Sequence, residues 1–89
     1  MPVISFERKV LLFGNAMICR GAAIRKLDDG REDSRVVARV VVSQCLNEHH
    51  AIADAYGFGF NSEDAQSMFH DMALADVLEA RAQSRQVKP

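Results

Sequence analysis

The sequence predicts an α+β fold, in which an antiparallel sheet of about three strands precedes two helices in the order β-β-β-α-α. Three observations support this prediction. Residues 4–12 mostly alternate between two faces, residues 35–42 are rich in valine, and residues 44–82 carry helical spacing and capping residues. The alternative is an all-α fold, in which residues 34–56 form one long helix.

The first strand is predicted over residues 4–12. An extended chain places most of the apolar residues of this segment on one face, namely Ile4, Phe6, Val10 and Leu12. Gly14-Asn15 follows, and glycine at the first central position is what a two-residue type II′ hairpin turn requires. We therefore expect residues 16–27 to return as a second, antiparallel strand.

The third strand is predicted after the clearest turn in the chain, Asp28-Asp29-Gly30. Residues 35–42 read Arg-Val-Val-Ala-Arg-Val-Val-Val, and β-branched residues favour strands because their χ1 angle is already restricted. A helix that begins near Ser34 is the alternative, since the valines also recur at helical spacing.

Two helices are predicted in the second half. In residues 44–56 the spacing of four, three and four residues indicates one helical face, formed by Cys45, His49, Ile52 and Tyr56. Gly57 stands where a left-handed residue ends a helix. Asn61 is a suitable N-cap for a last helix over residues 62–82.

Length and composition indicate a single small domain over residues 1–85, with a frayed tail over residues 86–89. Apolar residues make up 48% of the chain and charged residues 26%, which is typical of a globular protein that can form a core. No apolar run is long enough to span a bilayer, and the first residues do not resemble a signal peptide. We therefore expect a cytoplasmic protein without membrane contact, whose two cysteines, Cys19 and Cys45, are buried free thiols.

Charge is distributed unevenly along the chain. Residues 1–44 carry eight Lys or Arg against five Asp or Glu, whereas residues 45–80 carry seven acidic residues and no Lys or Arg. Such a segment repels phosphates and attracts basic protein surfaces. The predicted partner-binding residues are the acidic ones: Glu48, Asp54, Glu63, Asp64, Asp71, Asp76 and Glu79.

From this charge pattern the sequence predicts a non-enzymatic regulatory or inhibitory protein. It would act by direct contact between an acidic helical surface and a basic surface of another protein. A phage or mobile-element factor that blocks a host nucleic-acid machine fits this description. The sequence offers no catalytic residues and no cofactor site, because neither cysteine has an assignable base in an electropositive surrounding.

Two other functions are weighed against this one. A small dimeric nucleic-acid-binding regulator would use the basic residues of the first half, Arg20, Arg25, Lys26, Arg31, Arg35 and Arg39. Nucleic acid binding is not expected, because no aromatic residues interleave these cations and the last helix has no cation before Arg81. A zinc site built on Cys45, His49 and His70 is the second, and no metal is expected because ligand-pair motifs such as CxxC are missing.

The last helix has more apolar surface than one small sheet can cover. One apolar stripe of this helix is formed by Ala65, Met68, Phe69, Met72 and Ala73. Three further apolar residues, Leu74, Val77 and Leu78, point well away from it. We therefore expect a homodimer formed through the outer face of this helix, with Leu74, Val77 and Leu78 in the interface.

Overall fold

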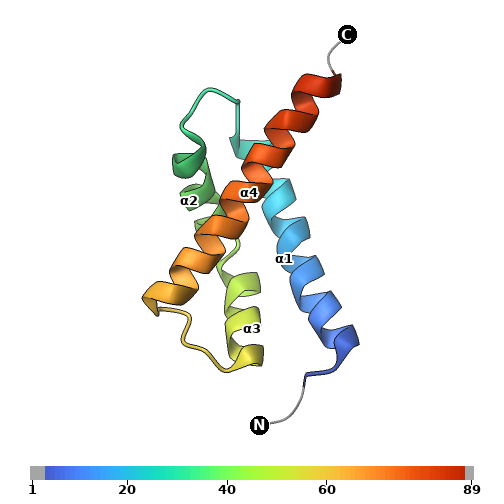
Figure 1. The fold of residues 1–89 in the computed structure, drawn as a ribbon, viewed down its shortest axis with the longest axis vertical. Coiled ribbons are helices and arrows are strands. Elements are labelled where there is room, and N and C mark those ends of the chain that lie inside the picture. The colour runs from blue at the N-terminus through green and yellow to red at the C-terminus, as the bar shows by residue number, and fades with distance from the viewer. Residues whose placement is uncertain (1–3, 88–89) are drawn as a thin grey trace.

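Four helices make up the computed structural model, which describes residues 4–87 (Figure 1). They are α1 (Phe6–Leu27), α2 (Ser34–Gln44), α3 (Leu46–Tyr56) and α4 (Glu63–Val87). The predicted sheet is wrong: residues 6–27 form one helix, residues 35–42 lie within another, and the described residues contain no strand. The all-α alternative is the correct fold class, although Cys45 divides the expected long helix in two.

Local capping explains where the first two helices begin. The Ser5 side chain accepts a hydrogen bond from the backbone N–H of Arg8, and Asp33 caps α2 through the N–H of Arg35 at 2.8 Å. The turn at Asp28-Asp29-Gly30 is confirmed, since Gly30 has a φ of 82° and Asp28 accepts its N–H at 3.0 Å.

The second half follows the predicted helices closely. Gly57 ends α3 with a φ of 75°, and Phe58 N–H bonds to the Ala53 carbonyl at 3.1 Å, which forms a Schellman motif. The cap of α4 is Ser62 rather than the predicted Asn61, because the Ser62 hydroxyl accepts the Ala65 N–H at 3.1 Å. Helix α4 continues to Val87, and residues 88–89 of the predicted frayed tail lie outside the described residues.

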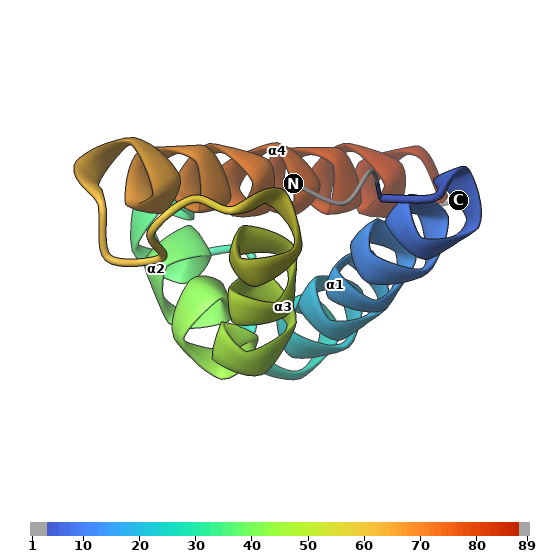
Figure 2. The same cartoon turned by 90° about the horizontal axis from the view of Figure 1, so that it is seen from below.

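Helix α4 forms one layer and lies across the other three helices, and its most extensive contact is with α2 (Figures 1 and 2). The molecule is elongated, with principal extents of 51, 27 and 16 Å. Its core accordingly divides into two apolar clusters. One cluster joins the C-terminal halves of α1 and α4 to α2, and the other joins their N-terminal halves to α3.

A disulfide bond links Cys19 of α1 to Cys45 at the junction of α2 and α3. The prediction of two free thiols is therefore wrong. The two residues are separated by 26 positions in the sequence, with a Cα–Cα distance of 6.0 Å, which the local patterns of the sequence could not reveal. The bond fixes the point at which the chain leaves α2 and enters α3.

Candidate functional site

The acidic residues of α3 and α4 are the first candidate site. Of the seven carboxylates in residues 45–80, only that of Asp76 forms an ion pair with a Lys or Arg of the described chain. Five of the remaining six are exposed, namely Asp54, Glu63, Asp64, Asp71 and Glu79. The negative charge expected from the sequence is therefore left largely without cationic partners within the described chain.

Helix α4 positions part of this charge on its solvent face. The core side of α4 carries Ala65, Phe69, Ala73 and Val77, each four residues after the one before. Asp64 and Asp71 are seven residues apart and therefore lie on one face of the helix. This face is opposite the core residues, and both side chains are exposed. Glu63 and Asp64 also lie in the first turn, where carboxylates interact favourably with the helix dipole.

The other two predicted acidic residues are placed differently. Glu48 is half-buried at a pocket of about 430 Å³ between α1 and α3, which is also lined by Cys19, Asn15 and Asn47. Asp76 points inward, and its Oδ2 accepts a hydrogen bond from Arg20 Nε at 2.6 Å. Asp76 is therefore committed to an internal contact.

Arg20, His49 and Asp76 form a polar cluster that links α1, α3 and α4. Arg20 is only 4% exposed, and its Nη1 lies 3.2 Å from Nε2 of the fully buried His49. A guanidinium has only donors, so Nε2 is the acceptor and the neutral ring carries its proton on Nδ1. That Nδ1 has no hydrogen-bond partner among the described residues, and the ring stacks on Phe69 with centroids 4.4 Å apart.

Burial of the His49 ring lowers its pKa to about 4, and the neighbouring Arg20 guanidinium contributes in the same direction. The ring is therefore neutral at pH 7. The ring is fully buried between Arg20 and Phe69, and it lies on the helical face that the sequence predicted for it with Cys45 and Ile52. Among residues 4–87, no group lies within hydrogen-bond distance of Nδ1 to receive or supply a proton.

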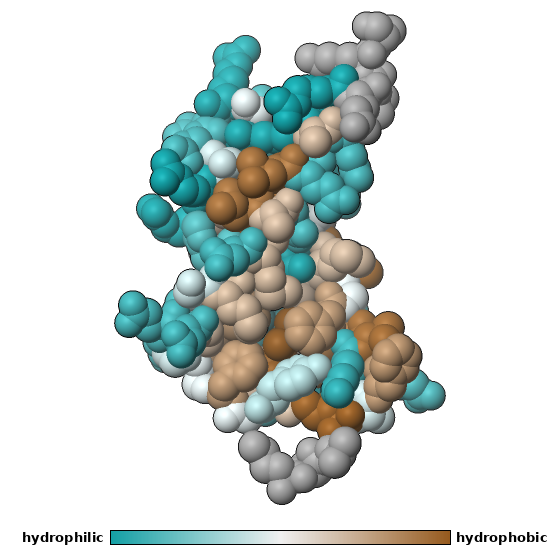
Figure 3. Space-filling model, viewed as in Figure 1, coloured by the Kyte–Doolittle hydropathy of each residue, from teal (hydrophilic) through white to brown (hydrophobic). Residues whose placement is uncertain are grey.

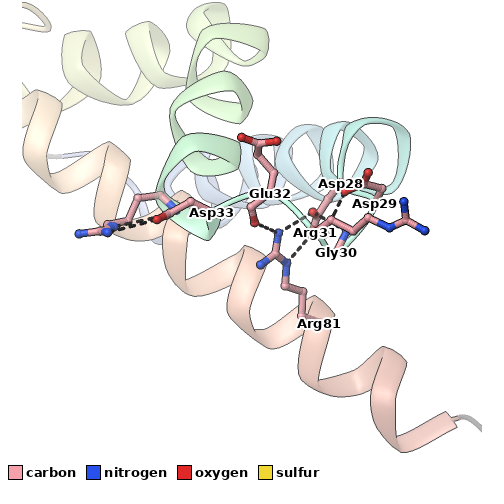
Figure 4. A network of polar contacts seen from close by, with 8 residues as sticks. Asp28, Asp29, Gly30, Arg31, Glu32, Asp33 and Arg81 are labelled. Carbon is pink, nitrogen blue, oxygen red and sulfur yellow. Dashed lines mark hydrogen bonds and ion pairs between the residues drawn. The ribbon is translucent and has the colours of Figure 1, made fainter.

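A second network ties the loop after α1 to α4 (Figure 4). The Arg81 guanidinium donates to both carboxylate oxygens of Asp28, at 2.9 and 2.8 Å, and to the Glu32 carbonyl at 2.7 Å. These hydrogen bonds lower the pKa of Asp28 and raise that of Arg81. One of the few cations of the last helix is thereby used to hold the loop.

The basic residues weighed as a nucleic-acid surface do not form a sheet face, since the sheet is absent from the described chain. Arg20 is buried, and the exposed Arg35 pairs with Asp33 through Nη2 at 3.2 Å. Arg35 and Arg39 lie one turn apart on α2 rather than on a strand. The exposed cations that remain are spread over α1, α2 and the loop between them: Arg25, Lys26, Arg31 and Arg39.

The three residues weighed as a zinc site are separated. The sulfur of Cys45 is bonded to Cys19, His49 faces Arg20, and the His70 Nε2 lies 3.3 Å from the Arg35 carbonyl. Within residues 4–87, one group of three potential ligands lies within reach of a single ion, formed by Cys19, Cys45 and Glu48. Its two sulfurs are joined in the disulfide, so it has no thiolate to offer.

The predicted dimer residues also differ in their surroundings. Val77 is fully buried in the core and Leu74 packs partly against the same cluster, whereas Leu78 is 51% exposed. Of these three residues, Leu78 alone presents a large apolar surface to solvent.

The apolar face of α1 was not predicted from the sequence. Exposed apolar side chains follow this helix along most of its length: Phe6, Val10, Leu11, Phe13, Met17, Ile18 and Leu27. Figure 3 shows hydrophobic side chains, in brown, gathered over its N-terminal half. Their helical spacing was present in the sequence, but it was obscured once residues 4–27 were assigned to two strands.

Comparison with models of protein families, with curated proteins and with solved structures found no match. A search of the helices of residues 4–87 found none that combines the length and the apolar character needed to cross a bilayer.

Proposed function

We propose that this chain is a non-enzymatic regulatory or inhibitory protein that acts by binding a basic surface of another protein. The observation that carries the proposal is the set of exposed carboxylates on α3 and α4 that have no Lys or Arg partner in the described chain; Asp71 lies 4.0 Å from Nδ1 of His70. Among them, Asp64 and Asp71 stand on the solvent face of α4 and are accessible to a large partner.

Electrostatics supports a protein partner over a polyanion. Uncompensated carboxylates create a negative potential that speeds the approach of a basic protein at low salt and slows that of nucleic acid. Basic surfaces are typical of proteins that hold nucleic acid. A host nucleic-acid machine that is blocked by a phage or mobile-element factor therefore remains the partner class we favour.

The proposal includes the cytoplasmic location that is expected from the sequence. The Cys19–Cys45 disulfide is an argument against it, because disulfides persist in oxidising compartments and are rare in the cytosol. Measuring the thiol state of the protein in its native cell decides between the two compartments.

The test is a quantitative capture experiment with the tagged protein and an extract of its native cell. The binding variant is Asp64→Lys/Asp71→Lys. The control is Asp29→Lys/Glu32→Lys, which changes the net charge equally but alters two exposed residues of the loop between α1 and α2. Melting curves of each variant establish that the fold is kept.

We expect a basic protein that the wild type and the loop control both retain and that the α4 variant loses. The proposal is contradicted if all three baits retain the same proteins in the same amounts. It is equally contradicted if the loop control loses the captured protein to the same extent, since net charge rather than the α4 surface would then explain the binding.

A further inference from the structure

Helix α1 presents an unpartnered apolar face to solvent. The side chains of Leu11 and Ile18 are 58% and 68% exposed, and those of Val10 and Met17 are 56% and 59% exposed. The buried residues of the same helix, including Leu12, Ala16 and Ile24, occupy the opposite side. A helix of 22 residues is about 33 Å long, so this face is an extended strip rather than an isolated contact.

The centre of this strip follows a seven-residue repeat. The spacing alternates between four and three residues through Glu7, Leu11, Gly14, Ile18, Gly21 and Arg25. This is the spacing by which two helices pack side by side in a coiled coil. Large residues and glycines alternate along the strip, and a charged residue of opposite sign stands at each end.

The two glycines have no explanation within the monomer. A Cβ atom at Gly14 would meet nothing within 4 Å, and one at Gly21 would meet only the end of the Arg25 side chain, at 3.5 Å. Glycine is a poor helix former, and neither position requires its conformational freedom, since both lie inside α1 without a positive φ. A close approach by another chain is the remaining physical reason for a glycine in such a place.

We propose that the occupant of this face is a second copy of the same chain, with the two α1 helices antiparallel about a two-fold axis at the level of Ala16. Such an axis places Leu11 opposite Gly21 of the other copy and Ile18 opposite Gly14. Each large side chain then meets a glycine, and the match occurs twice because the contact is symmetric.

The charges fit the same arrangement. The axis that pairs large residues with glycines also places Glu7 of one copy opposite Arg25 of the other, at both ends of the contact. A parallel arrangement would set Glu7 against Glu7 and glycine against glycine, which leaves like charges and unfilled space. The complementarity therefore selects a second copy and also its direction.

The dimer is expected to be reversible. A contact made by one helix from each copy is small beside the roughly 800 Å² per partner of a standard stable interface. The surface is separate from the acidic residues of α4, so the dimer does not depend on the proposed function. This proposal places the dimer interface on α1 instead of on the residues of the last helix predicted from the sequence, Leu74, Val77 and Leu78.

Sedimentation velocity over a range of protein concentrations tests the proposal. We expect the wild type to dimerise, and we expect Glu7→Arg and Arg25→Glu each to raise the dissociation constant about tenfold. The double variant Glu7→Arg/Arg25→Glu should return close to the wild-type value, because the pair is restored with its charges exchanged.

Two further variants distinguish the specific helix–helix contact from non-specific hydrophobic association. Gly14→Leu adds apolar surface but occupies the space assigned to Ile18 of the other copy, so dimerisation should weaken while the monomer stays folded. Ile18→Glu should abolish the dimer, whereas the matched control Leu78→Glu on α4 should leave it intact. A wild type that remains monomeric at the highest concentration, a double reversal no better than the single ones, or a stronger dimer with Gly14→Leu would each overturn the proposal.

Discussion

At the scale of single residues, the least predictable feature is the polar cluster of Arg20, His49 and Asp76, in which Arg20 and His49 are buried. Its spacing to Cys45 and Ile52 placed His49 on one helical face, and the structure shows that this face is buried. Arg20 was named only in the alternative hypothesis, as part of a basic surface. Its partners are 29 and 56 residues away in the sequence, and no local pattern reports contacts at that range.

The buried histidine predicts a loss of stability in acid. Its pKa is about 4 in the folded protein against 6.5 as the ordinary value, so the unfolded chain binds the proton more readily. Stability should therefore fall as the pH is lowered from about 6.5 to about 4, by roughly 3 kcal/mol from this residue. Urea unfolding at a series of pH values measures the slope.

The control for this prediction is His49→Leu, which removes the titrating group from the same buried position. Its free energy of unfolding should change much less than that of the wild type between pH 7 and pH 4.5. An equal loss of stability in both proteins between pH 7 and pH 4.5 would show that groups other than His49 govern the acid response.

At the scale of elements, the turns at Gly30 and Gly57 were predictable and the first two helices were not. The hairpin turn predicted at Gly14-Asn15 lies inside α1, and the cap of α4 is Ser62 rather than Asn61. Gly30 and Gly57 adopt the positive φ that their neighbours in the sequence suggest, since such preferences are local. The valines of residues 36–42 prefer strands only weakly. Val37 and Val41 pack into the core from α2, which outweighs that preference.

The disulfide is expected to stabilise the arrangement of α1 against the α2–α3 junction. It closes a loop between residues 26 positions apart, and restricting the unfolded chain to that loop is worth about 3 kcal/mol. Urea unfolding of the wild type with and without a phosphine reductant should reveal this difference as a lower midpoint after reduction.

The matched control is Cys19→Ala/Cys45→Ala. Its urea midpoint should lie near that of the reduced wild type and should not change when the reductant is added. If reduction leaves the wild-type midpoint unchanged, the bond contributes nothing to stability and the helices are held by packing alone.

At the scale of the whole molecule, the sequence predicted the charge but not the apolar face. The absence of Lys and Arg from residues 45–80 is a property of composition and survives any change of fold, so the acidic residues could be proposed in advance. The sequence could not predict which of these carboxylates form ion pairs within the molecule, and Asp76 pairs with the buried Arg20. The face of α1 depended on assigning the helix correctly, and the repeat through Gly14 and Gly21 was the signal that could have revealed it.

The association rate with the captured basic partner, measured at increasing salt, tests most directly whether the acidic surface steers binding. For the wild type we expect the rate to fall steeply as salt rises, because steering by exposed charge is screened. For Asp64→Lys/Asp71→Lys we expect a slower rate at low salt and a much flatter dependence. A wild-type rate that does not change with salt, or a variant that associates as fast as the wild type, would contradict the account.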